Sequence, residues 1–298
     1  MQSFSRGWAF LKQAWSMAFK DKDLLKPSIY ALIVGMVVAV IGIIPIIIAA
    51  VAFGDNQIGR VIMGIMGAAL MFVQFVVSYV FSAMTIYLIY GYLTKGDGKM
   101  DEAWAVVRRD FFDILTLAAV STVVGMMRSA ANGNRRNSLV AGILRGLTRA
   151  VEALWTEAAL LVLPAMVIDD LSLKDGLARI VKITKENLLL IGISTVGVRF
   201  VTGLIGFLLG VIGFAIAFAI GGGAAYVSGG STAISIIGIV IGALIFFAFV
   251  MVASIFSSYT NTAYHTCLYI WAREVETAKA SGSSVPVMAP APLAAALA

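Results

Sequence analysis

Two long apolar segments between Arg145 and Gly213 contain ionisable side chains that hydrocarbon does not tolerate alone. Glu152 and Glu157 lie near the start of the first segment, and Arg199 interrupts the second. In a bilayer, ionised side chains persist only when they are paired, hydrated or turned toward the inside of a helix bundle. The sequence therefore predicts a membrane protein whose helices enclose a polar interior.

The composition is far too apolar for a soluble domain. Of the 298 residues, 60% are hydrophobic and only 13% are charged, and the mean hydropathy is +0.96. Several apolar runs exceed about 20 residues, the length with which an α-helix crosses a bilayer. Because the alternating pattern of barrel strands is missing from the sequence, we predict an all-α, polytopic transmembrane bundle.

We predict one transmembrane domain over residues 1–272, followed by a disordered Ala/Pro-rich tail over 273–298. The six predicted spans lie near 28–53, 61–93, 111–130, 138–168, 188–220 and 232–262.

An amphipathic helix over 3–26, ended by Pro27, precedes the first span. Its aromatic residues recur at helical spacing and its other face carries lysines, which is typical of a helix lying in the bilayer interface. Comparable basic helices near 100–112 and 172–187 precede spans three and five. The chain therefore resembles three variants of one unit, each an amphipathic helix followed by a hairpin.

Basic residues predict the orientation. The amino terminus, the 94–112 turn, the 169–187 turn and the tail contain 5, 4, 4 and 2 Lys or Arg residues. This distribution favours both termini in the cytoplasm of a bacterial or archaeal plasma membrane, with the basic residues contacting anionic lipid headgroups and not nucleic acid. The arginines at 135, 136, 145 and 149 oppose this orientation. Either the rule is overridden there, which we favour, or segments three and four form a re-entrant pair.

The depths of the charged residues predict two ion pairs. Glu157 lies twelve residues before Asp169, and Arg199 lies twelve residues after Asn187. At ~1.5 Å per residue, both lie roughly 18 Å from the same membrane face if both helices begin there. A similar count places Arg128 level with Glu152. We expect Arg199 to pair with Glu157 and Arg128 with Glu152.

These residues define a candidate polar cavity. Its predicted members are Arg128, Arg145, Arg149, Glu152, Glu157 and Arg199. One interpretation is a solvated vestibule that attracts anions or lipid phosphates. The other is structural, with ion pairs that fix helix register and surplus arginines that reach headgroups. Arg199 also shares a helix face with Gly203, Gly206, Gly210 and Gly213, which predicts close helix packing along that face.

His265 and Cys267 are the only histidine and cysteine, so the sequence predicts neither a multi-histidine or cysteine metal site nor another bound cofactor. His265 could ligate a single pigment or haem, or exchange a proton. Because it lies among Tyr, Asn and Thr residues, we interpret it as a hydrogen-bonded structural histidine.

Three stretches of the sequence resemble a family of prokaryotic polytopic membrane proteins of unknown function. They are FSRGWAFLKQAW with DKDLLKP, the central VLPAMVIDDLSLKDGLARIVKITKENLL, and NTAYHTCLYIWA. The family is distantly similar to the membrane domains that precede some glycerophosphodiester phosphodiesterases. The resemblance implies a six-helix fold and no catalytic residues. The arginine-rich 135–149 region and the tail depart from the family, and no phosphodiesterase chemistry is carried over.

The sequence thus predicts a non-enzymatic channel- or transporter-like protein, either as a homo-oligomer or with a partner membrane protein. The alternative is a scaffold or accessory subunit that organises lipids or partner proteins. An enzyme is disfavoured because no nucleophile–base constellation is visible in the sequence.

Overall fold

The computed structural model describes residues 2–54, 56–133, 139–227, 232–281 and 287–297, and within them it contains helices and no strand. The elements are α1 (Gln2–Lys20), η1 (Lys22–Leu24), α2 (Lys26–Phe53), α3 (Gln57–Lys95), α4 (Met100–Arg109), α5 (Phe111–Gly133), α6 (Leu139–Asp169), α7 (Leu173–Val227), α8 (Thr232–Ala280) and α9 (Ala291–Leu297). Six helices are long and apolar enough to cross a membrane, one for each predicted span. The all-α fold class is confirmed.

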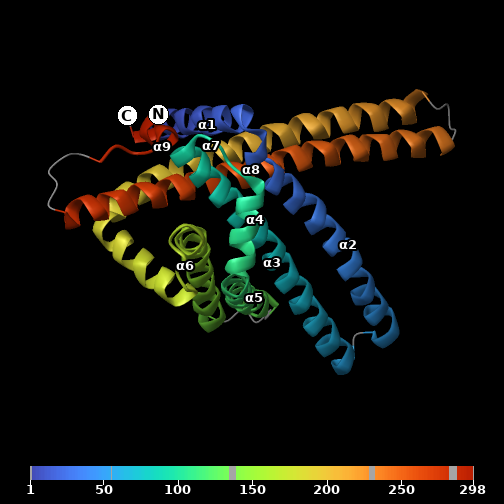
Figure 1. The fold of residues 1–298 in the computed structure, drawn as a ribbon. Helices are drawn as coiled ribbons and strands as arrows, with labels where there is room; N and C mark the ends of the chain where they lie inside the picture. The colour runs from blue at the N-terminus through green and yellow to red at the C-terminus, as the bar shows by residue number, and fades with distance from the viewer. Residues whose placement is uncertain (1, 55, 134–138, 228–231, 282–286, 298) are drawn as a thin grey trace.

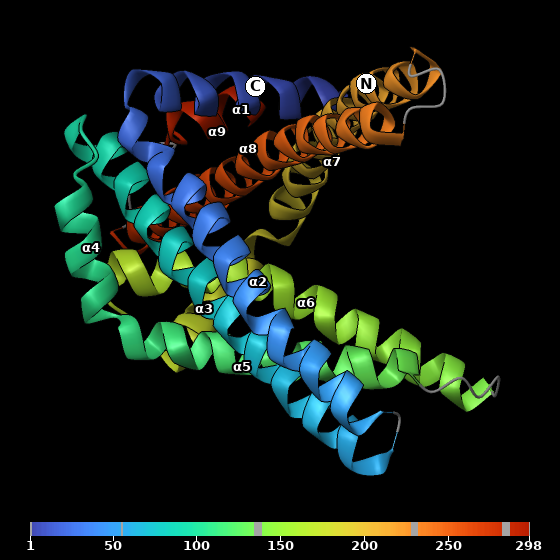
Figure 2. The same cartoon turned by 90° about the vertical axis from the view of Figure 1, so that its right-hand side faces the viewer.

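Three helical hairpins, α2–α3, α5–α6 and α7–α8, spread apart from a common junction (Figures 1 and 2). The buried core lies at this junction, where Phe10, Ile89, Ile114, Met166 and Tyr264 are almost completely inaccessible. These residues come from α1, α3, α5, α6 and α8, so the core joins all three hairpins.

The outer halves of two hairpins, α2–α3 and α7–α8, present apolar surface. Val40, Ile65, Phe218 and Leu244 each keep between 63% and 71% of their surface exposed. Removing such side chains from water is favourable by about 25 cal/mol per Å², so in the folded chain these ends are suited to contact with acyl chains.

The first amphipathic helix is shorter than predicted, because α1 ends at Lys20 and not at Lys26. Asp21 has an extended backbone, and its carboxylate accepts the N–H of Asp23 at 3.0 Å and that of Gly98 at 3.0 Å. Pro27 does not end this helix. It lies in the first turn of α2, where a missing N–H costs nothing because that N–H has no partner inside the helix.

The predicted third amphipathic helix, 172–187, is not separate from span five but forms the beginning of the continuous helix α7. Likewise, α8 continues 18 residues beyond the predicted end of span six at residue 262. Ion pairs explain the polar ends of both helices. Arg273 of α8 contacts Asp169 of α6 at 3.1 Å, and Glu276 of α8 contacts Arg179 and Lys182 of α7 at 3.3 and 2.7 Å.

The prediction of a disordered tail is wrong for the described residues. Arg273 to Ala280 belong to α8, and α9 packs beside α1 (Figure 1), with Leu293 fully buried. The indole N–H of Trp271 donates to the carbonyl of Val287 at 3.3 Å. Alanine and leucine are strong helix formers. Burial of Leu293 adds a tertiary contact that cannot be predicted from a low-complexity sequence.

Candidate polar cavity

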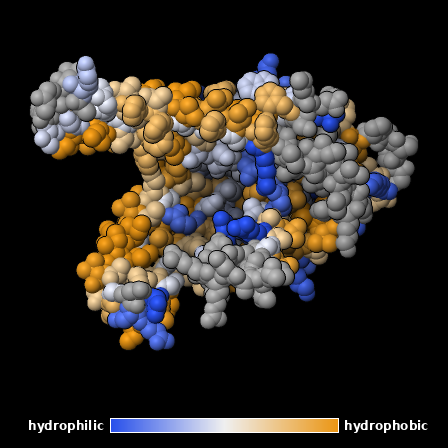
Figure 3. All heavy atoms as spheres, turned by 180° about the vertical axis from the view of Figure 1, so that it is seen from behind, coloured by the Kyte–Doolittle hydropathy of each residue, from blue (hydrophilic) through white to orange (hydrophobic). Residues whose placement is uncertain are grey.

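A cavity of about 350 Å³ lies between α6 and α7, within the part of the chain predicted to span the membrane. Arg149, Glu152, Glu157 and Arg199 line it together with Thr156 and two apolar residues. In Figure 3, hydrophilic side chains gather in the recess between the apolar helical hairpins of the molecule. Arg149, Glu152 and Thr156, which recur at helical spacing on α6, all line the cavity.

The ion pair between Arg199 and Glu157, predicted from their equal depths, is present in the structure. A guanidinium nitrogen of Arg199 on α7 contacts one carboxylate oxygen of Glu157 on α6. The two side chains remain 46% and 36% exposed, so the pair faces the cavity and is not sealed inside a dry core.

The second predicted pair is also present, between Arg128 of α5 and Glu152 of α6. Neighbouring hydrogen bonds fix this contact between helices. The indole N–H of Trp155 donates to the hydroxyl of Ser121 at 2.9 Å, and Ser121 also shares a hydrogen bond of 2.7 Å with the hydroxyl of Tyr79. Arg128 is thus joined to the cavity by its ion pair with Glu152, which lines the cavity.

Arg149 has no ionic partner among the side chains that the structure describes, although it lines the cavity and is exposed. Arg145, the sixth predicted member, lies outside the residues whose side chains are described. Among the described members, Arg128 and Arg199 are paired with the two glutamates, and Arg149 is the third arginine, without a described counter-charge. The surplus positive charge makes the cavity a favourable environment for an anion.

His265 adjoins the site, although it is not among the predicted members of the cavity. Its Nε2 lies 3.6 Å from the second carboxylate oxygen of Glu157, and its Nδ1 lies 2.8 Å from the carbonyl oxygen of Asn261. The hydrogen bond agrees with the structural interpretation of this histidine, whereas its contact with Glu157 was not predicted. Counting residues along the sequence predicts how far along its helix His265 lies. It does not predict which neighbouring helix the side chain faces.

The expected close packing along the glycine face of α7 is only partly correct. A methyl group built at Gly203, Gly206 or Gly210 would meet nothing within 4 Å, whereas one at Gly213 would lie 2.6 Å from the Cβ atom of Phe249. The helices α7 and α8 thus approach closely toward the tip of their hairpin, and the glycines between Arg199 and Gly213 face open space.

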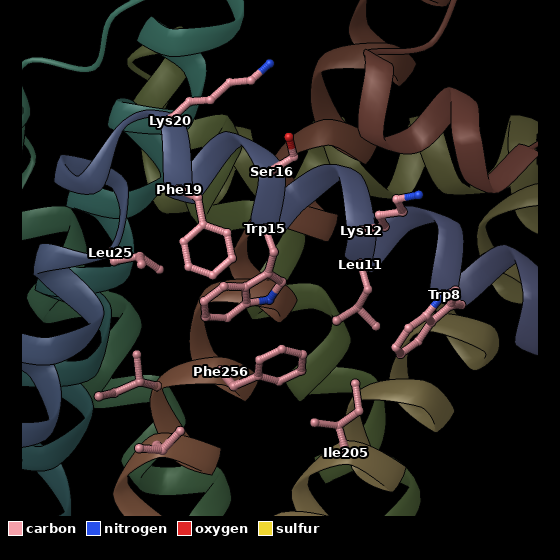
Figure 4. Close-up of a pocket in the computed structure, with 12 residues that line it drawn as sticks. Trp8, Leu11, Lys12, Trp15, Ser16, Phe19, Lys20, Leu25, Ile205 and Phe256 are labelled. Carbon is pink, nitrogen blue, oxygen red and sulfur yellow. The ribbon is translucent and has the colours of Figure 1, made fainter.

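A second, apolar hollow of about 850 Å³ lies beneath the amphipathic helix α1. Leu11, Trp15 and Phe19 point from α1 toward Ile205 of α7 and Phe256 of α8 (Figure 4). The stacked rings of Trp15 and Phe256, with centroids 4.7 Å apart, form part of its wall. Lys12 and Lys20 lie at its rim, with Lys20 pointing away from the hollow (Figure 4).

Together, six long apolar helices, exposed apolar arms and a recessed charged cavity define a multi-pass α-helical integral membrane protein. No family model matches the chain, and no curated protein matches it either. The resemblance to the prokaryotic membrane protein family therefore stays a prediction.

Proposed function

We propose that the protein is a non-enzymatic, channel- or transporter-like membrane protein that admits small anions to the polar cavity. The proposal depends on one observation, that Arg149 faces the cavity without a described ionic partner. A purely structural ion pair needs matched charges, whereas an unmatched guanidinium beside a hydrated cavity attracts anions. The cavity is also large enough for several water molecules, each of which occupies about 30 Å³ in the liquid.

The test is anion flux into liposomes that contain the purified protein and a halide-sensitive dye. We expect halide entry above that of empty liposomes, and Arg149→Ala should lower it severalfold while the melting temperature in detergent stays unchanged. Arg108→Ala is the matched control, because Arg108 lies on α4 and its guanidinium covers the ring of Trp104, with 5.7 Å to the ring centroid. Equal flux in the Arg149 and Arg108 variants, or no flux in the parent, would contradict the proposal.

A second candidate function is a membrane scaffold that organises lipids, and the apolar hollow beneath α1 favours it. The occupant suited to this hollow is an anionic phospholipid, with one acyl chain against Leu11, Trp15 and Phe256 and its headgroup at Lys12 or Lys20. A buried chain contributes about 0.8 kcal/mol per CH₂, and lysines near anionic lipid add about 1 kcal/mol each.

Lipid binding separates the two functions. Native mass spectrometry in vesicles of phosphatidylcholine with one quarter phosphatidylglycerol should detect retained phosphatidylglycerol, and Ile205→Trp should displace it by filling the hollow. Val240→Trp, on an exposed part of α8 away from the hollow, is the control. Retention of lipid without any halide flux would favour the scaffold over the channel- or transporter-like function.

A further inference from the structure

The buried imidazole of His265 is held in one tautomer. Its Nδ1 lies 2.8 Å from the carbonyl oxygen of Asn261, one turn earlier on α8. A carbonyl oxygen only accepts hydrogen bonds, so Nδ1 must carry the hydrogen and donate it. In the neutral ring, Nε2 is therefore the atom without a proton.

This bare Nε2 points at a carboxylate. His265 is 2% exposed, and its Nε2 has no hydrogen-bond partner among the described residues. Glu157 Oε2 lies 3.6 Å away. With the ring neutral and Glu157 ionised, two acceptors face each other with no hydrogen between them, and buried acceptors normally have a donor. One added proton resolves the conflict.

The charges around His265 favour a single proton at this point. Glu157 faces it from α6, and Arg199 of α7 contacts the other oxygen of the same carboxylate. From α8 itself, Tyr264 packs edge-on against the imidazole, with ring centroids 5.2 Å apart, and Phe10 of α1 packs on Tyr264. Arg199 thus occupies Oε1 and leaves Oε2 for a proton held by Nε2.

We infer that His265 and Glu157 form a proton-binding site that regulates the anion occupancy of the polar cavity. A proton from cavity water adds to the Nε2 lone pair and forms an N–H bond directed at Glu157 Oε2. An O–H bond of a hydronium ion in the cavity breaks as this N–H bond forms and leaves neutral water, so the charge of the cluster rises by one beside Arg199. An anion in the cavity then binds more tightly, and by linkage the anion strengthens proton binding to the same degree. The anion-coupling part rests on the proposed function, whereas the proton site does not.

Because His265 is the only histidine of the chain, it can be observed without assignment. Protein labelled with ¹⁵N-histidine and purified on a tag free of histidine gives one pair of ring nitrogen signals by NMR. We expect the neutral ring to be the Nδ1–H tautomer in the parent protein. Glu157→Gln should lower the ratio of imidazolium to neutral ring at fixed pH about tenfold, the usual effect of an opposite charge at this range. Glu152→Gln, which removes a carboxylate of the same cavity that does not face His265, should change it far less.

Replacing gluconate by chloride should raise the imidazolium fraction in the parent, and His265→Gln should abolish the pH dependence of halide flux while flux persists. An Nε2–H tautomer in the parent, or an equal response to the two glutamate variants, would overturn the proton site. Insensitivity to chloride with flux retained would overturn the coupling alone. Absence of flux with a Glu157-dependent titration would instead refute the proposed function and leave the proton site standing.

Discussion

Glu157 combines two interhelical contacts in one side chain, because its two carboxylate oxygens face Arg199 of α7 and His265 of α8. Half-exposed ion pairs contribute little on their own, since water screens them. Here the two contacts fix the register between helices. The contact with Arg199 aligns α6 with α7, and the contact with His265 aligns α6 with α8.

A double-mutant cycle measures the Arg199–Glu157 contact. We expect Arg199→Ala and Glu157→Gln to be non-additive by about 0.5 to 1 kcal/mol in the free energy of unfolding in mixed detergent, because both remove the same pair. The control cycle joins Arg128→Ala with Glu157→Gln, since Arg128 pairs with Glu152. Equal coupling in both cycles would show that the pair is not specific.

Asp110 is a buried carboxylate at the junction of α4 and α5, outside the apolar spans. It accepts two hydrogen bonds from the guanidinium of Arg109, at 2.6 and 3.0 Å. Burial nevertheless raises the pKa of Asp110 above its usual value, because desolvation of the ionised form outweighs the attraction of Arg109. Arg109 also contacts Asp170 at 3.0 Å. The carboxylate of Asp110, by holding Arg109, therefore helps to join α4 to the turn after α6.

The raised pKa of Asp110 predicts a pH dependence of stability. Between its ordinary pKa and its raised folded value, the folded state binds more protons than the unfolded state, so this group's contribution to stability falls as pH rises. Asp110→Asn cannot ionise. Its stability relative to the parent should therefore increase from pH 4 to pH 7, as measured by melting temperature in detergent at each pH. A relative stability that decreases over this range would contradict the assigned pKa direction.

At the scale of elements, α7 changes its packing along its length. Near Gly213 it touches Phe249 of α8, and from Gly210 toward Arg199 its glycines face open space. Small residues allow close approach of helices in membranes, but they do not enforce it. The open glycines at 203, 206 and 210 leave this face of α7 available to lipid or to a second copy of the chain.

Two glycine substitutions distinguish the packed from the open part of α7. Gly213→Ala should destabilise the protein by about 1 to 3 kcal/mol, because its new methyl group collides with the side chain of Phe249. Gly206→Ala should be neutral or stabilising by up to about 1 kcal/mol, because alanine is the better helix former and the space is open. Unfolding in mixed detergent measures both. Similar losses would indicate that Gly206 is also packed, as in an oligomer.

At the scale of the molecule, both chain ends meet on one side of the junction, since α9 packs beside α1 (Figure 1). An even number of crossings, as the sequence predicts, would place both ends on the same side of a membrane. Three hairpins that share one core, two of which (α2–α3 and α7–α8) have apolar outer ends, also explain how the charged cavity lies in a recess between helices that lipid surrounds.

Cysteine labelling tests this topology. Cys267 is fully buried, so Cys267→Ala provides a background into which single exposed cysteines are placed at Gln57, Gly146 and Ala280. In intact cells, an impermeant maleimide should label Gln57→Cys and Gly146→Cys but reach Ala280→Cys only after permeabilisation. Protection of Gly146→Cys from outside would instead support a re-entrant α5–α6 pair.

The number of apolar spans and the depths of the charged side chains could be predicted from the order of residues along the chain. Apolar run length decides whether a helix can cross a bilayer, and a constant rise of about 1.5 Å per residue converts sequence number into depth. That is why Arg199 could be matched to Glu157 and Arg128 to Glu152. Which helix faces meet could not be predicted in this way, because it depends on tertiary packing. The approach of His265 to Glu157, the open glycines of α7 and the docking of Leu293 depend on how segments distant in sequence rotate and pack against one another, and no local pattern records that rotation.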